Sequence, residues 1–149
     1  MTIGRPRLVS IELTYGCHNG RFVFPDRSGP VVIVGPNGAG KTTLMEALVL
    51  TLYGLDLRRE PQRLQNRLPW QNEGCVATVV LADESGETLS VDRNFRSQEV
   101  IVRRLSDGVE IFRGDGSPGG NNSEASQYRR WLASPASRVT IVDSTARLP

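Results

Sequence analysis

The chain has almost no lysine, little cysteine and histidine, and no long apolar run. Its only cysteines, Cys17 and Cys75, lack the spacing of a metal-binding pair. Neither a disulfide framework nor a zinc site is therefore expected, and both thiols should be reduced and structural. The longest apolar run near the start, residues 31–34, is far too short for a signal-peptide core or a membrane span. We therefore expect a cytoplasmic protein without a membrane partner.

Positive charge is carried almost entirely by arginine. The 149 residues include 18 basic and 16 acidic side chains, and the formal net charge of +2 is too small to predict nucleic-acid binding by itself. Lys41 is the only lysine, which indicates a position that requires a compact ammonium rather than a planar guanidinium. With 38% hydrophobic and 23% charged residues, the chain has the composition of one globular domain.

In the first half of the chain, the pattern of apolar residues predicts three strands and then a helix. Residues 8–14 alternate between apolar and polar side chains, as in a strand with one buried face, and residues 21–24 predict a second strand. The continuous β-branched run at 31–34 is typical of a strand buried on both faces of a sheet. Apolar positions spaced by four residues predict a helix over 41–53, which Gly54 should end.

The second half predicts an antiparallel meander followed by a helix. Strand-like segments at 75–82, 88–93 and 99–105 are separated by short polar turns, which favours antiparallel neighbours. Ser123 resembles an N-cap and should begin a helix over 124–133. The remaining segments are an irregular polar stretch at 55–72, a short strand at 109–112 and a last strand-like run at 138–143.

Residues 35–42, Gly-Pro-Asn-Gly-Ala-Gly-Lys-Thr, match the phosphate-binding pattern GxxxxGK[ST] at every specified position. Gly38 and Gly40 allow successive backbone N–H groups to turn inward and surround an anion. The helix that follows should add the positive end of its dipole. Lys41 is expected to reach the β- and γ-phosphates of ATP, and the Thr42 hydroxyl is expected to bind Mg²⁺.

The predicted nucleotide-binding residues form this loop or follow it immediately. They are Pro36, Asn37, Gly38, Ala39, Gly40, Lys41, Thr42 and Thr43, with ATP and Mg²⁺ as ligands and Thr42 as the metal ligand. A chance glycine-rich turn between a strand and a helix is the alternative explanation. Eight residues in register, with a suitable strand before them and a helix after them, argue against that alternative.

The stretch 31–55, VVIVGPNGAGKTTLMEALVLTLYGL, resembles the N-terminal half-site of the SMC and SbcC chromosome-maintenance and DNA-repair ATPases. Within it, residues 44–48 (LMEAL) are similar to a helix shared by that family, and residues 52–54 (LYG) to its aromatic-glycine stop. Residues 91–95 (VDRNF) are similar to the family's R-x-F strand end. The resemblance covers about residues 7–133 and is most specific around the glycine-rich loop.

This resemblance implies an α/β fold, namely the N-terminal lobe of an ABC-class P-loop NTPase. Such a lobe contains a buried strand, the P-loop and its helix, together with an antiparallel β meander. We expect one lobe over 1–149, with a nucleotide-binding core at 7–55, the meander at 74–113, and a helix and strand at 123–149. The implied function is ATP binding, and ATP hydrolysis with further parts, in DNA repair (including double-strand break repair) or chromosome handling.

The resemblance also implies parts that are not recognised in this sequence. Family members hydrolyse ATP with a loop glutamine, an LSGGQ-like signature and a strand ending in Asp-Glu, and a long coiled coil separates their halves. The chain has no heptad run, and Ser144 stands where the glutamate would follow Asp143. Asp143 is either the metal-side carboxylate of that strand or a turn-capping residue of an ordinary strand. Catalytic residues stay unassigned, and a coiled coil, a C-terminal ATPase lobe and a homodimer partner are expected beyond this chain.

Two other functions are compatible with the glycine-rich loop. An ABC transporter nucleotide-binding domain also carries GPNGAGKTTL, and Tyr15, 26 residues before Lys41, would suit an adenine-stacking aromatic. The polar, arginine-rich stretch after the helix argues against this class. A stand-alone nucleotide-binding module is the third possibility. The length of the open reading frame would distinguish it from an SMC-like ATPase. The sequence departs from the family pattern at Gly16, where many SMC-like proteins carry an arginine that can touch phosphate.

A basic cluster follows the predicted helix and consists of Arg58, Arg59, Arg63 and Arg67. Exposed cations neutralise phosphates, so a contact with the DNA backbone is one interpretation. The other interpretation is a solvated surface whose charge is balanced by Asp56 and Glu60. The sequence favours the solvated surface and leaves the DNA contact open.

Overall fold

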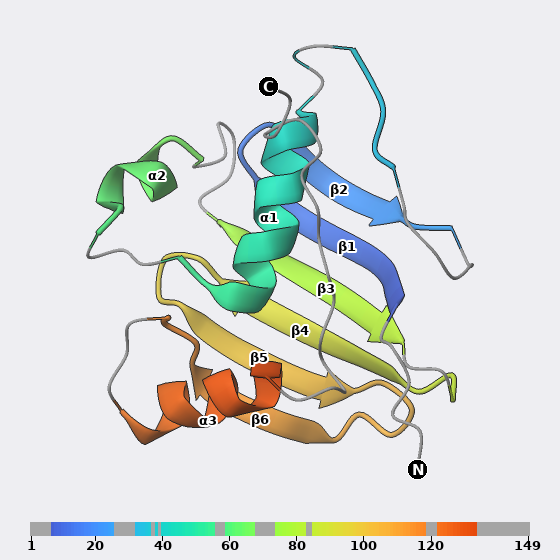
Figure 1. Ribbon diagram of the computed structural model, residues 1–149, viewed down its shortest axis with the longest axis vertical. Helices are drawn as coiled ribbons and strands as arrows, with labels where there is room; N and C mark the ends of the chain where they lie inside the picture. The colour runs from blue at the N-terminus through green and yellow to red at the C-terminus, as the bar shows by residue number, and fades with distance from the viewer. Residues whose placement is uncertain are drawn as a thin grey trace.

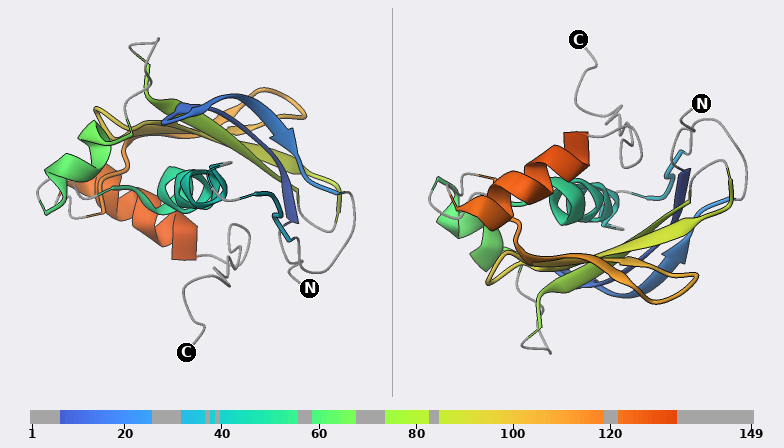
Figure 2. Two further views of the ribbon diagram at one scale, coloured as in Figure 1. Left: turned by 90° about the horizontal axis from the view of Figure 1, so that it is seen from above. Right: turned by 90° about the horizontal axis from the view of Figure 1, so that it is seen from below.

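The computed structural model describes residues 7–25, 32–36, 38, 40–55, 59–67, 74–82, 85–118 and 122–133. Its strands are β1 (Arg7–Tyr15), β2 (His18–Val23), β3 (Val76–Ala82), β4 (Thr88–Asn94), β5 (Glu99–Arg104) and β6 (Glu110–Asp115). The helices of the described residues are α1 (Lys41–Tyr53), α2 (Pro61–Gln65) and α3 (Ser123–Ala133). The six strands form one antiparallel sheet in the order β2-β1-β3-β4-β5-β6, and α1 and α3 cover one of its faces (Figure 1, Figure 2). None of these helices combines the length and apolarity that a membrane crossing requires.

The strands from β3 to β6 form the predicted meander, because each pairs with its neighbour in the sequence. In the turn between β4 and β5, the Asn94 side chain accepts hydrogen bonds from the backbone N–H groups of Arg96 (2.9 Å) and Ser97 (3.2 Å). In the next turn, Gly108 takes a φ of 73° that glycine adopts readily. The antiparallel meander is therefore confirmed, and β6 extends further than the short strand that the sequence indicated.

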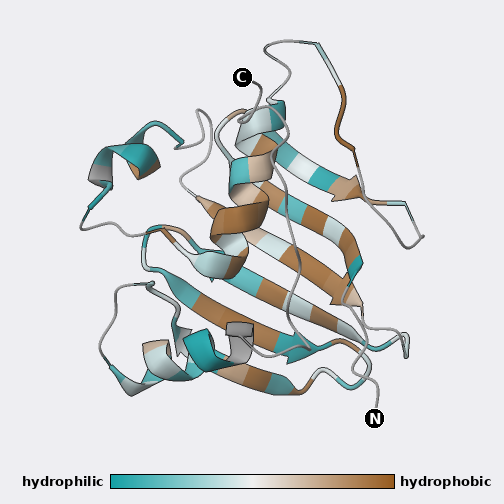
Figure 3. Cartoon of the chain, viewed as in Figure 1, coloured by the Kyte–Doolittle hydropathy of each residue, from teal (hydrophilic) through white to brown (hydrophobic). Residues whose placement is uncertain are grey.

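A row of apolar side chains crosses the sheet and forms the floor of the core. Register pairs join Ile11 to Val79, Val79 to Val91, and Val91 to Val102, and all four side chains are fully buried. The buried apolar residues of α1 that pack in the same core are Leu44, Ala47, Leu48, Leu50 and Leu52 (Figure 3). A fully buried aliphatic side chain contributes roughly 1.5–3 kcal/mol, so this packing holds α1 firmly on the sheet.

The predicted buried strand at residues 31–34 is wrong in its described part. Residues 32–36 have no regular secondary structure, and Val32 and Val34 are 75% and 83% exposed. A β-branched run is buried on both faces only when other strands flank it and further layers cover it. The described residues pair no strand with this segment, so the antiparallel sheet and its helices are observed without the buried strand before the loop.

Two smaller expectations also need revision, and a third is not tested by the described residues. The stretch 55–72 is not wholly irregular, because it contains α2. The N-cap of α3 is Asn122 rather than Ser123, since the Asn122 side-chain oxygen accepts the N–H of Ala125 at 2.8 Å. The last strand-like run, 138–143, lies outside the described residues.

Candidate nucleotide-binding site

The glycine-rich loop ends where α1 begins, and its two described interior glycines are left-handed. Gly38 has a φ of 86° and Gly40 a φ of 85°, a region in which an L side chain is strained. Gly40 is the N-cap of α1 and carries no side chain with which to cap it. The first N–H groups of a helix lack partners within the helix and carry the positive end of its dipole. This end of α1 is therefore suited to an anion.

Lys41 lies back across the loop. Its Nζ donates to the carbonyl oxygen of Gly35 at 2.6 Å, so the ammonium joins the two ends of the motif. Thr42 is exposed and Thr43 is half-buried. Of the other predicted binding residues, Pro36, Gly38 and Gly40 are described, whereas Asn37 and Ala39 lie outside the described residues. The binding role of this loop stays a prediction.

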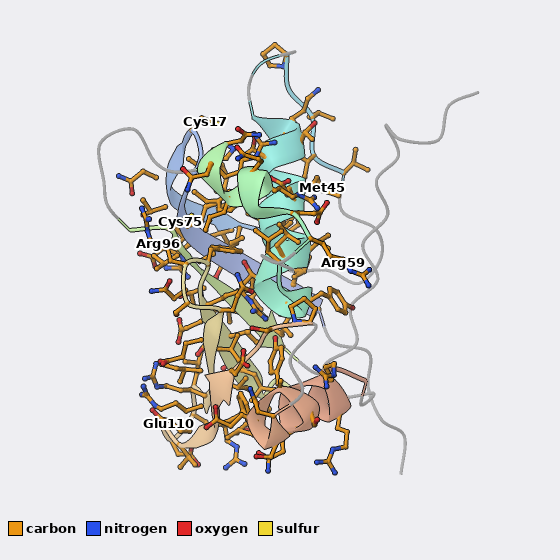
Figure 4. The ribbon with its side chains drawn as sticks, turned by 90° about the vertical axis from the view of Figure 1, so that its left-hand side faces the viewer. Cys17, Met45, Arg59, Cys75, Arg96 and Glu110 are labelled. Carbon is orange, nitrogen blue, oxygen red and sulfur yellow. The ribbon has the colours of Figure 1, made fainter. Side chains whose placement is uncertain are left out.

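The turn between β1 and β2 and the first residue of β2 pack against the end of the loop, a contact that the sequence did not predict. His18 Nε2 lies 2.8 Å from the carbonyl oxygen of Gly40. A Cβ atom at Gly40 would lie 2.6 Å from this nitrogen and 2.7 Å from the Cys17 Sγ, and Figure 4 shows Cys17 near the start of α1. The backbone conformation therefore favours glycine at position 40, and a side chain there would force His18 and Cys17 to move.

Gly16, in the same turn, also has a left-handed backbone and a close neighbour. Its φ is 58°, and a Cβ atom there would lie 3.0 Å from the Thr43 Cγ2. The Gly16 N–H donates to the carbonyl oxygen of Arg67 at 2.6 Å. The turn therefore contacts both α1 and the segment after α2. Since position 16 offers only backbone atoms, the arginine–phosphate contact of SMC-like proteins has no counterpart at this residue.

Tyr15 belongs to the core, so its interpretation as an adenine-stacking aromatic is wrong. The side chain is fully buried, and its ring centroid lies 4.8 Å from that of Phe95. The Tyr15 hydroxyl donates to Glu46 Oε2 at 2.9 Å. Burial, followed by the nearby Glu46 carboxylate, raises the pKa of Tyr15. The phenol therefore stays protonated and keeps donating to Glu46.

Glu46 joins α1 to the segment that contains α2. Its carboxylate accepts Arg63 Nε at 2.7 Å and Arg67 Nε at 2.6 Å, in addition to the Tyr15 hydroxyl. Burial alone raises the pKa of this carboxyl, but the hydrogen bonds from Arg67, Arg63 and Tyr15 outweigh it and hold the pKa below its ordinary value. The same hydrogen bonds raise the pKa values of the two guanidinium groups. Glu46 is therefore ionised and fully engaged at neutral pH.

The basic cluster is consequently not a purely solvated surface. Arg63 also pairs with Glu60 at 3.2 Å, as the sequence indicated, but its shorter contact is with Glu46. Arg59 is exposed and is labelled in Figure 4. Arg58 and Asp56 lie outside the described residues. Arg63 and Arg67 are engaged in holding their segment against α1, and a DNA contact by the other two arginines stays a prediction.

The described residues contain no group of three or more His, Cys, Asp and Glu side chains that could hold a metal ion. The expected Mg²⁺ relies instead on a hydroxyl and on phosphate oxygens, which are ligands that this cation prefers. Thr42 fits that role, because it is exposed in the first turn of α1 beside the end suited to phosphate. Asp143 and Ser144, the candidates for the acidic strand end, lie outside the described residues.

Comparison with known proteins identifies the family. Residues 10–127, which make up most of the chain, match the AAA domain family AAA_23. The chain belongs to this family. This AAA_23 domain is SMC/Rad50-like, so the resemblance seen in the loop and its helix is confirmed.

Two curated relatives of the AAA_23 chain are described as DNA double-strand break repair Rad50 ATPases. The protein from Nanoarchaeum equitans is 32% identical over 72 residues, which are 48% of this chain and 8% of the relative. The protein from Methanopyrus kandleri is 36% identical over 69 residues, which are 46% of this chain and 7% of the relative. The chain thus spans less than a tenth of the length of either relative. No solved structure gave a significant match.

Proposed function

We propose that this chain is the ATP-binding half-site of an SMC/Rad50-type ATPase acting in DNA double-strand break repair or chromosome handling. The observation that carries the proposal is the start of α1, where the left-handed Gly38 and Gly40 lead into a helix without a side-chain cap. Family membership and the two Rad50 relatives support the same function. The full phosphate-binding motif favours a nucleotide over other anions.

The residues of the loop would share the binding of the nucleotide. Backbone N–H groups at the start of α1 would bind phosphate oxygens. Lys41, which now donates to the Gly35 carbonyl, would donate to the β- and γ-phosphates instead. Thr42 and the phosphates would hold Mg²⁺, which neutralises part of the phosphate charge. Pro36, Asn37, Ala39 and Thr43 would complete the lining.

The segment 32–34 supports a second lobe through its two exposed valines. Val32 and Val34 are more than 70% exposed, although β-branched side chains are typical of buried strands. A C-terminal ATPase lobe that supplied neighbouring strands would bury them and complete the strand expected at 31–34. Hydrolysis would then use groups from that lobe and from a homodimer partner, which act as the γ-phosphoryl group leaves.

The competing functions are weaker explanations. The buried Tyr15 removes the aromatic on which the transporter interpretation depended. In a stand-alone module, none of the described residues would cover Val32 and Val34, which are 75% and 83% exposed. DNA binding is proposed for the complete protein, but not through Arg63 and Arg67, because both are paired with Glu46.

Titration calorimetry with Mg-ATP tests the proposal. Replacing Lys41 with Ala removes charge-assisted contacts with the phosphates and should weaken binding about tenfold or more. Arg130→Ala is the matched control, because it removes an exposed positive charge from α3, far from the start of α1 (Figure 1). Thr42→Ala should lose mainly the dependence on Mg²⁺. Equal affinity of the wild type and Lys41→Ala would rule out this site.

A further inference from the structure

The carbonyl oxygen of Gly40 has two hydrogen-bond donors. One is the backbone N–H of Leu44, at 2.9 Å, which makes the first bond of α1. The other is His18 Nε2, at 2.8 Å, which comes from a strand 22 residues earlier in the chain. A carbonyl oxygen has two lone pairs, so these two donors satisfy it and fix the orientation of its peptide.

The His18 ring is held in place by its own hairpin. His18 pairs in register with Tyr15, which is buried in the core. Its imidazole meets the Phe22 ring edge-on, with centroids 5.3 Å apart and an interplanar angle of 85°. The hydrogen bond from the Gly16 N–H to the Arg67 carbonyl, at 2.6 Å, anchors the turn between the two strands. The histidine is therefore presented to the loop from a fixed position.

We propose that His18 is a positioning residue for the phosphate-binding loop, an inference that rests on the proposed ATP site. The peptide between Gly40 and Lys41 is planar and trans, so its C=O and its N–H point in opposite directions. Holding the Gly40 oxygen between its two donors aims the Lys41 N–H off the start of the helix, toward the phosphates. His18 thus orients one donor of the anion site without touching the nucleotide.

Gly40 needs this external support because it has no side chain to restrict its backbone. Without the contact from His18, its peptide would sample other orientations, and ordering it again on binding would weaken affinity. A carbonyl oxygen only accepts, so His18 Nε2 must carry the proton. Glutamine offers an N–H donor with similar reach, whereas leucine fills a similar volume without a donor. The two substitutions therefore separate hydrogen bonding from packing.

The test measures the Kd for Mg-ATP by titration calorimetry, with the thermal midpoint of each variant recorded in parallel. His18→Leu should raise the Kd about three- to tenfold, as expected for the loss of one ordering hydrogen bond. His18→Gln should stay within about twofold of the wild type, and so should the control Asn19→Ala, which changes an exposed neighbour. The thermal midpoints of the Leu and Gln variants should agree within about 3 °C, which excludes a general loss of folding.

Wild-type affinity in His18→Leu, alongside lost binding in Lys41→Ala, would overturn this inference and leave the ATP site standing. Equal weakening by Gln and Leu would also overturn it, because the donor would then be irrelevant. A wild-type chain that does not bind Mg-ATP would overturn the proposed function and this inference with it. If His18→Leu fails to fold, His18→Asn replaces it. The asparagine amide is one methylene shorter than that of glutamine and should not reach the Gly40 oxygen, so the same rise in Kd is expected.

Discussion

The guanidinium of Arg93 donates from Nε to the carbonyl oxygen of Thr51, 2.8 Å away, near the C-terminal end of α1. Its Nη1 donates to the Gln98 side chain at 2.8 Å and to the Gly116 carbonyl at 2.9 Å, and the residue is only 1% exposed. A cation here complements the helix dipole and satisfies carbonyls that the helix leaves unpaired. Arg93 therefore fastens the far end of the helix whose start forms the candidate site.

Replacing Arg93 with Met should lower the free energy of unfolding by about 3–5 kcal/mol, because several buried acceptors lose their donor at once. Arg93→Lys should lose less, since it keeps a charge but lacks the planar fork. Urea unfolding followed by circular dichroism measures both. The exposed Arg96→Met, in the turn after β4, is the control and should change stability by less than about 0.5 kcal/mol. A loss below about 1 kcal/mol in Arg93→Met would contradict the anchoring role.

Glu46 should make stability depend on pH in the acid range. Its pKa in the folded chain lies below the ordinary value of 4.5, so the ionised carboxylate stabilises the fold above that pH. This contribution is lost as the pH falls through the folded pKa. Glu46→Gln should therefore be less stable than the wild type by about 1–2 kcal/mol at neutral pH. This figure is smaller than for a fully buried pair, because water screens the partly exposed Arg63 and Arg67.

The difference in stability between wild type and Glu46→Gln should shrink steadily from about pH 5 to about pH 3. Urea unfolding at a series of pH values measures it, with Glu12→Gln, an exposed residue of β1, as the control. A difference that stayed constant down to about pH 3 would show that the ionised form of Glu46 contributes nothing.

The meander and α1 were predictable because local interactions build them. Strands β3, β4 and β5 each pair with the next strand through a short turn, and their alternating side chains indicate which face is buried. α1 ends at Gly54, whose φ of 87° suits glycine. The special backbone of Gly38 and Gly40 was predictable for the same reason, since the motif itself encodes it. The alternation in β1 also places Tyr15 on the buried face of Ile11 and Leu13. That pattern predicts a buried Tyr15, whereas its distance from Lys41 in the sequence suggested an adenine-stacking role.

Expectations failed where the structure depends on residues far apart in the sequence. Helix α2 has five residues and is held by contacts such as that between Arg63 and Glu46, 17 positions apart. The contact between His18 and Gly40 exists only because the first hairpin packs on the loop, and its one sign in the sequence was a single histidine after the first strand. The burial of residues 31–34 depends on neighbouring strands that an apolar pattern cannot supply.

The two cysteines should react at different rates. Cys17 is exposed beside Gly40, whereas Cys75 is buried and its burial raises its pKa to about 11, so only Cys75 fits the expectation of a structural thiol. The thiolate is the nucleophile, so a maleimide at neutral pH should modify Cys17 and spare Cys75 until the chain unfolds. Mg-ATP bound at the loop should slow the reaction at Cys17.

Peptide mass spectrometry over time measures both rates, with and without Mg-ATP. Cys17→Ser should remove the fast reaction, and Lys41→Ala should remove the protection by nucleotide. An unchanged rate at Cys17 under saturating Mg-ATP would place the nucleotide away from this turn.

The two exposed valines of segment 32–34 give the last prediction, which concerns the proposed C-terminal lobe. Val32 and Val34 lie in a segment without regular structure, so their amides should exchange with deuterium rapidly in this chain. If the proposed C-terminal lobe is present and pairs strands with this segment, backbone hydrogen bonds should form and exchange should slow about a hundredfold or more. Residues of β4, already paired on both sides, are the internal control and should be protected in both samples.

Val34→Asp should leave the fold of this chain intact, because the side chain is 83% exposed. It should prevent the slowing of exchange, because strand pairing with the lobe would bury its charge. Rapid exchange at 32–35 in a protein that contains the proposed lobe would show that no strand forms there, and the case for a lobe that covers this segment would fail.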